Sequence, residues 1–197
     1  MARPREFDET AVLAAAREVF WTKGYAAASV DAIGVATGLG KGSLYGAFGG
    51  KRGLFGQVFD QYCTNALRAT AAALAGPDHE ALERLRAFVS AGAAATGGDA
   101  RRGCLLAKSV AELGDHDARV QQRANETYRL MEDYLTATVE AAQRHGSLRP
   151  DGDARALAQT LLTLQRGLEA LGKVGTPVSG ATVLDVVLTS NNGALDQ

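Results

Sequence analysis

The sequence predicts an all-α protein with a three-helix, helix-turn-helix head at its N-terminus and a larger helical body behind it. Alanine is abundant, and proline occurs only 4 times in 197 residues, a composition that favours helices over strands. Apolar residues recur at the three- and four-residue spacing of helices along most of the chain. Glycine and proline interrupt this pattern at intervals, so we expect about nine helices.

Composition and charge exclude several classes of protein. Hydrophobic residues make up 46% of the chain, enough for a core, and the formal net charge of -1 argues against a generic basic coat protein for nucleic acid. The first 52 residues are slightly basic, so a local basic face can still meet phosphates. Two cysteines imply no disulfide framework, and no signal segment or membrane-length apolar run is seen. We therefore expect a soluble, cytoplasmic protein.

The first helix is expected from Asp8 to about Lys23. Asp8 is a suitable N-cap, because its carboxylate can accept hydrogen bonds from the free N–H groups of the first turn. Gly24 is expected to end the helix, since glycine tolerates the left-handed conformation found at helix C-termini. The apolar stripe of this helix consists of Val12, Ala15, Ala16, Val19 and Phe20.

Two short helices joined by a glycine-containing turn follow, which is the helix-turn-helix pattern. Ser29 is the expected N-cap of the first, and the second runs from about Lys41 to Phe48. Because the two helices cross steeply, the turn needs a residue that is comfortable at positive φ, and Gly38 meets this need. The segment from Ser29 to Phe48 is therefore the part of the chain most informative about function.

The second short helix has the surface that reading a DNA major groove requires. Leu39 is expected to fill the space between the two helices, and the small Gly34 and Ala36 are expected to let them approach closely. Leu44 and Phe48 face inward. The outward face carries short, slim or polar residues, namely Lys41, Gly42 and Ser43.

The remaining helices belong to the body. A long helix is expected from about Lys51 to Leu74, and Gly76-Pro77-Asp78 breaks the chain after it. The other helices are expected near residues 82–96, 104–113, 118–145, 153–171 and 180–190.

The stretch from Val30 to Phe48, VDAIGVATGLGKGSLYGAF, resembles the DNA-binding signature of the TetR (tetracycline repressor) family. The flanks agree: FWTKGY at 20–25 resembles the end of the family's first helix, and GGKRGLF at 49–55 resembles the entry to its fourth. The family usually has a polar cap, often serine, where this chain has Gly40. The resemblance implies a DNA-binding domain at 1–52 and a ligand-binding and dimerisation domain at 53–197.

The resemblance also implies a set of DNA contacts. Three residues of the second short helix would lie in the major groove, others would contact phosphates, and an N-terminal arm would enter the minor groove or touch phosphate. Tyr45 as a core aromatic, Lys51 as a solvated residue and an arm without a role are the alternatives. The implied DNA-binding residues are Arg3, Arg5, Ser29, Thr37, Lys41, Gly42, Ser43, Tyr45 and Lys51.

Two aliphatic stripes near the C-terminus are hard to bury within one small monomer, so they favour a homodimer. In the resembling family the last two helices pack across a two-fold axis, which implies a palindromic DNA operator. The alternative is an ordinary intramolecular core. The expected dimer-interface residues are Leu161, Leu164, Leu168, Leu171, Val183, Val186 and Val187.

The middle helices of the resembling family enclose a ligand pocket, which implies a small-molecule effector. The candidate lining here is mostly apolar and favours a largely apolar effector, although core packing explains most of these residues equally well. Cys104 stands at the start of a helix, where it lines the pocket, senses oxidants or metals, or is simply a small buried residue. The candidates are Phe88, Cys104, Leu105, Tyr128, Met131 and Gln165.

Other classes of function are disfavoured. The chain has no nucleophile elbow, phosphate-binding loop or dinucleotide fingerprint, and no metal-ligand spacing links its histidines and cysteines, so we expect neither a cofactor nor a metal. The sequence therefore predicts a ligand-responsive, dimeric transcriptional repressor and not an enzyme. An activator of the same fold is one alternative, because repression is inferred from the habit of the family. An all-helical enzyme whose site shows no short motif is the other.

Overall fold

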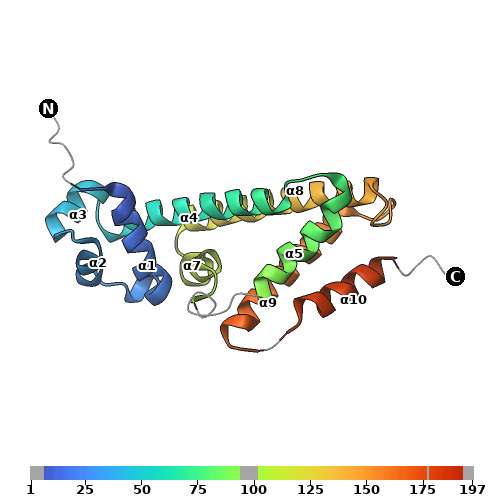
Figure 1. Cartoon of the computed structure of the whole chain (residues 1–197). Coiled ribbons are helices and arrows are strands. Elements are labelled where there is room, and N and C mark those ends of the chain that lie inside the picture. Colours follow the sequence, from blue (N-terminus) through green and yellow to red (C-terminus); the bar gives the residue numbers. More distant parts are fainter. Residues whose placement is uncertain (1–6, 94–101, 177, 193–197) are drawn as a thin grey trace. The chain divides into compact units, whose positions relative to one another are not determined.

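A computed structural model of the chain describes residues 7–93, 102–176 and 178–192 (Figure 1). The described residues form nine α-helices, one short 3-10 helix and no strand, which confirms the predicted all-α class. Within this part of the chain, no helix combines the length and the apolar composition that spanning a bilayer requires. In chain order the elements are α1 (Glu9–Ala27), α2 (Val30–Thr37), α3 (Lys41–Phe48), α4 (Lys51–Leu74), η1 (Asp78–Glu80), α5 (Ala81–Ala93), α7 (Leu105–Leu113), α8 (Ala118–Arg144), α9 (Ala154–Lys173) and α10 (Gly180–Asn192).

Contacts within the chain divide it into two compact units. The first unit comprises Met1–Thr64 together with Leu105–Ala124, and the second comprises Asn65–Cys104 together with Asn125–Gln197. The first unit therefore contains α7 and the start of α8 as well as the helix-turn-helix. The first unit thus extends past residue 52, where the functional boundary was expected. It does so because α4 continues without a break beyond that residue and because α7 packs on α1.

Local capping explains where α1 begins and turns. The carboxylate of Asp8 accepts hydrogen bonds from the N–H groups of Thr10 (2.9 Å) and Ala11 (3.3 Å), as expected for an N-cap. Gly24 has φ +80°, so the regular part of the helix ends there, as predicted, although three further residues continue in a helical turn. The buried ring of Phe20 meets the ring of Phe55 edge-on at 5.1 Å between centroids, which ties α1 to α4.

The helix-turn-helix has the predicted bounds and turn. The Ser29 hydroxyl accepts from the N–H of Ala32 at 3.1 Å, and Gly38 has φ +72°. A Cβ on Gly34 would lie 2.9 Å from the carbonyl oxygen of Leu39, so close approach does require glycine there. The same prediction is wrong for Ala36, whose side chain is exposed because α2 turns only a narrow face, centred on Ile33, toward the core.

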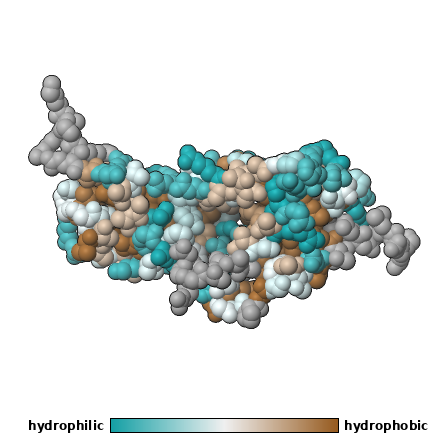
Figure 2. All heavy atoms as spheres, viewed as in Figure 1, coloured by the Kyte–Doolittle hydropathy of each residue, from teal (hydrophilic) through white to brown (hydrophobic). Residues whose placement is uncertain are grey.

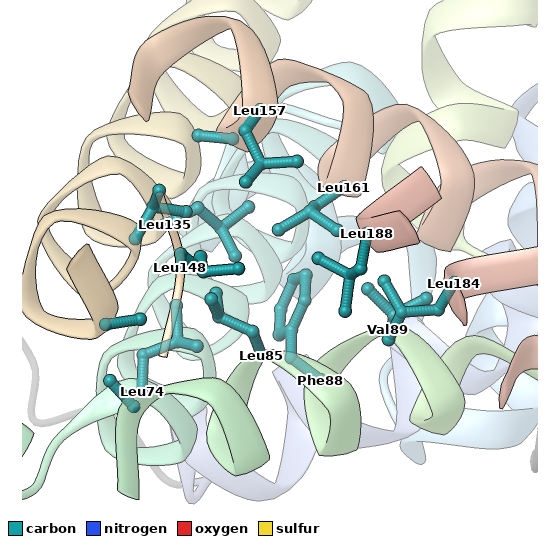
Figure 3. Packing of buried hydrophobic residues seen from close by; sticks show 14 of the residues in the cluster. Leu74, Leu85, Phe88, Val89, Leu135, Leu148, Leu157, Leu161, Leu184 and Leu188 are labelled. Atoms are coloured by element: carbon teal, nitrogen blue, oxygen red, sulfur yellow. The ribbon is translucent and has the colours of Figure 1, made fainter. Parts of the chain in front are cut away.

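The second unit is built around one aliphatic core (Figure 3). Side chains from α5, α8, α9 and α10, with Leu74 at the end of α4 and Leu148 in a loop, point toward one another there. Arg84 stabilises the break between α4 and α5, because its guanidinium donates to the carbonyl oxygens of Leu74 (3.0 Å) and Pro77 (2.7 Å). The Asp153 carboxylate caps α9 by accepting from the N–H of Ala156 at 3.0 Å.

Candidate DNA-binding surface

The α3 helix presents two different sides. Leu44 and Phe48 are buried in the first unit, whereas the side formed by Lys41, Gly42, Ser43, Tyr45 and Gly46 is exposed. The exposed side carries an ammonium group, a hydroxyl and a phenol between stretches of bare backbone. A surface of this kind is slim enough to enter a major groove and still offers hydrogen-bond donors to base edges and phosphates.

The glycines of this surface are not required by the fold. A Cβ added to Gly40, Gly42 or Gly46 would meet no atom within 4 Å, and none of these three has positive φ. Each glycine inside a helix is nevertheless less favourable than alanine by roughly 1 kcal/mol. Gly40, at the N-cap of α3, also makes no side-chain capping bond. The exposed side of α3 is therefore kept bare at the expense of helix stability.

Lys41 is paired within the first unit. Its ammonium lies 3.1 Å from the Asp31 carboxylate, and both side chains are largely exposed. An exposed ion pair of this kind contributes only about 0–1 kcal/mol, so it can exchange readily for another anion.

Two of the expected phosphate-contacting residues have structural tasks as well. The Ser29 hydroxyl caps α2 and is exposed at its N-terminus. The Thr37 hydroxyl makes two hydrogen bonds: it donates to the carbonyl oxygen of Ile33 (2.8 Å) and accepts from the N–H of Leu39 (3.3 Å). Thr37 therefore holds the turn between the two helices.

Tyr45 is not a core aromatic. Its side chain is 58% exposed, which excludes that alternative. The ring lies over Gly50, where a Cβ would come within 2.9 Å of the ring and where φ is +101°. Gly50 thus gives the ring its place and leaves it at the surface of the first unit.

Lys51 is not a freely solvated residue either. Its ammonium donates to the carbonyl oxygen of Ala26 at 3.3 Å and lies 4.4 Å from the centroid of the Tyr25 ring. These contacts tie the start of α4 to the end of α1. Arg3 and Arg5, the expected N-terminal arm, lie outside the described residues.

Sequence reasoning missed a group of polar residues that hold the first unit together from α7 and α8. Glu112 and Lys108 on α7 both bind the backbone of α1. Arg52 donates to Asp117 at 2.9 Å, and Asp117 also accepts from the N–H of Arg119 at 3.1 Å. No short motif signals such contacts, because the partners are far apart in sequence.

The charge state of Asp117 follows from this arrangement. Burial opposes ionisation of the carboxyl group, but the hydrogen bonds from Arg52 and from the backbone outweigh it and lower the pKa of Asp117 below its ordinary value of 3.8. Asp117 is therefore a carboxylate at neutral pH. A pocket in the first unit lies beside this ion pair and is lined by Arg52, Phe55, Gly56, Phe59, Asp60, Asp117, Arg119 and Val120.

The six candidate ligand residues are distributed between the two units. Leu105 is buried in the first unit, and the other five belong to the second. Phe88 lies in the aliphatic core beside Leu161 and Leu188, where core packing accounts for it (Figure 3). Met131 is buried, Tyr128 is half-buried, and Gln165 is buried and accepts a hydrogen bond from Arg166. Cys104 is half-buried, with the Arg166 guanidinium 3.3 Å from its sulfur.

The candidate dimer residues divide into three groups by their exposure. Leu161 and Leu168 are buried in the core of the second unit, so the alternative of intramolecular packing describes them. Leu164, Val183 and Val187 are half-buried. Leu171 and Val186 are 41% and 62% exposed. Figure 2 shows hydrophobic residues at the surface in the region of α9 and α10.

Two family models match the chain. One, described as bacterial regulatory proteins of the tetR family, matches residues 12–58, and the other, a tetracyclin repressor-like C-terminal domain, matches residues 81–177. The first covers the whole helix-turn-helix and the candidate DNA-binding surface.

Individual proteins agree with these models. The HTH-type transcriptional repressor ComR of Escherichia coli K12 is 27% identical over 174 residues, which cover 88% of this chain and 83% of ComR. A solved structure of the TetR family transcriptional regulator CifR, a cysteine mutant complexed with 26bp double-strand operator DNA, is 30% identical and has a TM-score of 0.68. The match covers 97% of this chain and 98% of the CifR chain. A regulatory protein TetR from Rhodobacter sphaeroides, at 22% identity and a TM-score of 0.78, shares the fold and is matched over 92% of this chain and 97% of its own.

Proposed function

This chain belongs to the TetR family of bacterial regulatory proteins and is a DNA-binding transcriptional regulator, and we propose that it represses transcription as a homodimer on a palindromic operator. We further propose that a small, largely apolar effector bound by the second unit releases it from DNA. The observation that carries the proposal is the exposed side of α3, which joins a polar, slim surface to a helix-turn-helix whose first helix is capped by Ser29. ComR, which is named a repressor, and the CifR structure complexed with operator DNA support it.

The DNA contacts that we propose fall into two classes. Lys41 and Ser43 contact base edges in the major groove, with Gly42 allowing the backbone of α3 to approach. Tyr45 and the exposed N-terminus of α2 at Ser29 contact phosphates. Lys51 and Thr37 act mainly by holding the helices that carry these groups, because their polar atoms are already bonded within the first unit.

The dimer interface that we propose is the outer side of α9 and α10. Leu171 and Val186 leave the largest apolar surfaces of the expected residues, and Leu164, Val183 and Val187 add the exposed parts of half-buried side chains. A second copy covering this surface would bury apolar area that one chain leaves in water. Two helix-turn-helix motifs related by a two-fold axis then require two half-sites of opposite orientation.

The effector site that we propose uses the second unit around Cys104, Tyr128, Met131 and Gln165. Met131 and Tyr128 offer apolar surface, and Gln165 and Arg166 offer polar atoms for orientation. Repression is favoured over activation because ComR, a curated relative whose match covers 88% of this chain, is named a repressor.

Footprinting tests the proposed function. The purified full chain should protect a symmetric site in the DNA upstream of its own gene, and Tyr45→Phe should weaken the protection without changing the thermal unfolding of the protein. Adding the chain to a transcription reaction from that DNA should lower the yield of transcript. Absence of any protected site at low salt would contradict the proposal, and a rise in transcript would instead favour activation.

A further inference from the structure

The backbone that joins α1 to α2 is held by charged side chains of α7. This segment, residues 24–28, is called the corner below. It begins at Gly24, with φ +80°, and leads directly into Ser29, the N-cap of α2. Both α7 and the corner belong to the first unit. The proposal that follows rests on the proposed function, because it concerns how the DNA-binding helices are positioned.

Glu112 holds the corner through two backbone donors. Its carboxylate accepts hydrogen bonds from the N–H groups of Tyr25 and Ala26, each at 2.7 Å. Because Gly24 leaves the helical conformation, these N–H groups begin a new turn and have no preceding carbonyl of α1 to bind. A Cβ on Gly24 would lie 2.9 Å from a Glu112 carboxylate oxygen, so glycine is also what admits the carboxylate.

Lys108 holds the other side of the same corner. Its ammonium donates to the carbonyl oxygens of Trp21 (2.9 Å) and Thr22 (3.2 Å), in the last regular turn of α1. These carbonyls lie at the negative end of the helix, where a cation is favoured. Lys108 and Glu112 are four residues apart on α7, so one side of this helix places a cation on free carbonyls and an anion on free N–H groups.

The α7 helix is itself fixed in the first unit at its two ends. The hydroxyl of Tyr62 on α4 accepts from the N–H of Leu105 at 3.3 Å, at the start of α7. Beyond its end, Asp117 binds Arg52 near the start of α4. The side chains of Leu105 and Leu106 are buried. The two charged side chains therefore reach α1 from a helix that is anchored to α4.

We propose that Glu112 and Lys108 are positioning residues for operator binding, although neither is part of the helix-turn-helix. By fixing the corner they fix the N-terminus of α2, and the same corner receives Lys51 from α4 through the carbonyl of Ala26. Without the carboxylate, the corner exchanges among several conformations in the free protein, and DNA must select the binding-competent one. The apparent affinity for the operator then falls in proportion to the fraction of protein molecules that are in the binding-competent conformation.

Substitution of Glu112 by glutamine tests the proposal, because the direction in which the operator affinity changes distinguishes a positioning role from general electrostatics. Glu112→Gln removes a negative charge from a DNA-binding unit, so general electrostatics predicts tighter binding. Loss of the contact predicts the opposite, an operator Kd raised by about tenfold to a hundredfold, as expected for charge-assisted hydrogen bonds. Binding is measured by fluorescence anisotropy with the full chain, at a temperature at which circular dichroism shows every variant folded.

Three further measurements separate positioning from contact. The slope of log Kd against log salt should stay that of the wild-type chain in Glu112→Gln, because no phosphate contact is lost. Hydrogen exchange of the Tyr25 and Ala26 amides should accelerate. Gly24→Ala, which displaces the carboxylate, should raise Kd, and the effects of Gly24→Ala and Glu112→Gln should not add.

Matched controls come from the second unit. Glu83, an exposed residue of α5, loses the same charge in Glu83→Gln and should leave Kd unchanged. Gly146 has φ +84° and no atom within 4 Å of an added Cβ, so Gly146→Ala introduces the same backbone strain as Gly24→Ala. Any change in operator Kd that Gly146→Ala causes should add to the change caused by Glu112→Gln. An operator affinity in Glu112→Gln equal to or tighter than the wild type overturns the positioning role alone. A wild-type chain that binds no DNA overturns the proposed function and the positioning role together.

Discussion

The two units of this chain hold their helices in place by different means. In the second unit, α5, α8, α9 and α10 meet through aliphatic side chains, with Leu161 and Leu184 fully buried (Figure 3). In the first unit an aromatic core is supplemented by charged side chains that bind free backbone groups at the corner. Apolar packing depends mainly on volume, whereas a charge on a backbone group depends on one atom in one place. Stability and DNA-reading geometry should therefore respond to different substitutions.

The largest expected effect lies in the core of the second unit. Leu161→Ala should lower the free energy of unfolding by about 2–5 kcal/mol, because it removes a fully buried side chain and leaves a cavity. Urea denaturation measures this, and the operator Kd of the folded protein should change little. Leu171→Ala, which removes a 41% exposed side chain, should cost less in unfolding and should weaken the proposed dimer in sedimentation experiments. Equal losses of stability in the two variants would contradict this assignment of core and surface.

The next largest effect is a loss of operator binding that leaves the stability of the protein unchanged. Lys41→Ala should weaken operator binding by about tenfold and relax the preference for the base that Lys41 contacts. Unfolding should be unchanged, because the ion pair of Lys41 with Asp31 is exposed. Asp31→Asn is the control, since it frees the Lys41 ammonium and should leave binding as tight as in the wild type or tighter. A loss of binding in Asp31→Asn comparable to that in Lys41→Ala would show that the pair, and not the ammonium, is what DNA requires.

The bare side of α3 gives a prediction in which stability and binding move in opposite directions. Gly42→Ala and Gly46→Ala should each stabilise the protein by about 0.5–1 kcal/mol, because a Cβ fits without contact in the free chain. Both should weaken operator binding, since the added methyl group stands between α3 and the groove. Thermal unfolding and anisotropy measure the two quantities. Gly56→Ala in α4, where a Cβ also meets nothing, should stabilise without affecting binding.

The smallest effect is a dependence on pH. The lowered pKa of Asp117 means that its carboxylate stabilises the folded state above the ordinary value of 3.8 and that this stabilisation is lost as the pH falls through the lowered pKa. Asp117→Asn should keep the cap of α8 and lose the pair with Arg52, at less than about 1 kcal/mol near pH 7. Urea denaturation should show the difference from wild type shrinking in acid. A difference that is independent of pH would contradict the role of the ionised pair.

Much of the fold and part of the candidate site could be predicted from the sequence. Caps and glycines mark ends locally, so Asp8, Gly24, Ser29 and Gly38 could be assigned from single residues and their neighbours. The two sides of α3 follow from helical spacing, since Leu44 and Phe48 share one side. Such features need no knowledge of the rest of the chain.

Features that depend on distant partners could not be predicted in this way. An aliphatic stripe looks the same whether it meets its own chain or a second copy, which is why Leu161 and Leu168 were expected at an interface and lie in the core. Glu112 contacts a backbone segment 86 and 87 residues away, and any carboxylate on an amphipathic helix has the same sequence pattern. Hydrogen bonds that Thr37 and Lys51 make to backbone carbonyls are equally invisible before the fold is known.

The anchoring of the corner by α7 has a practical consequence for engineering. A regulator could be given a new operator by moving a DNA-reading head from one body to another, with the cut placed after residue 52, at the end of the expected DNA-binding domain. In this chain such a transplant would separate Gly24 from Glu112 and Arg52 from Asp117. The portable module is discontinuous, and a chimera that retains specificity should carry residues 105–124 together with residues 7–64.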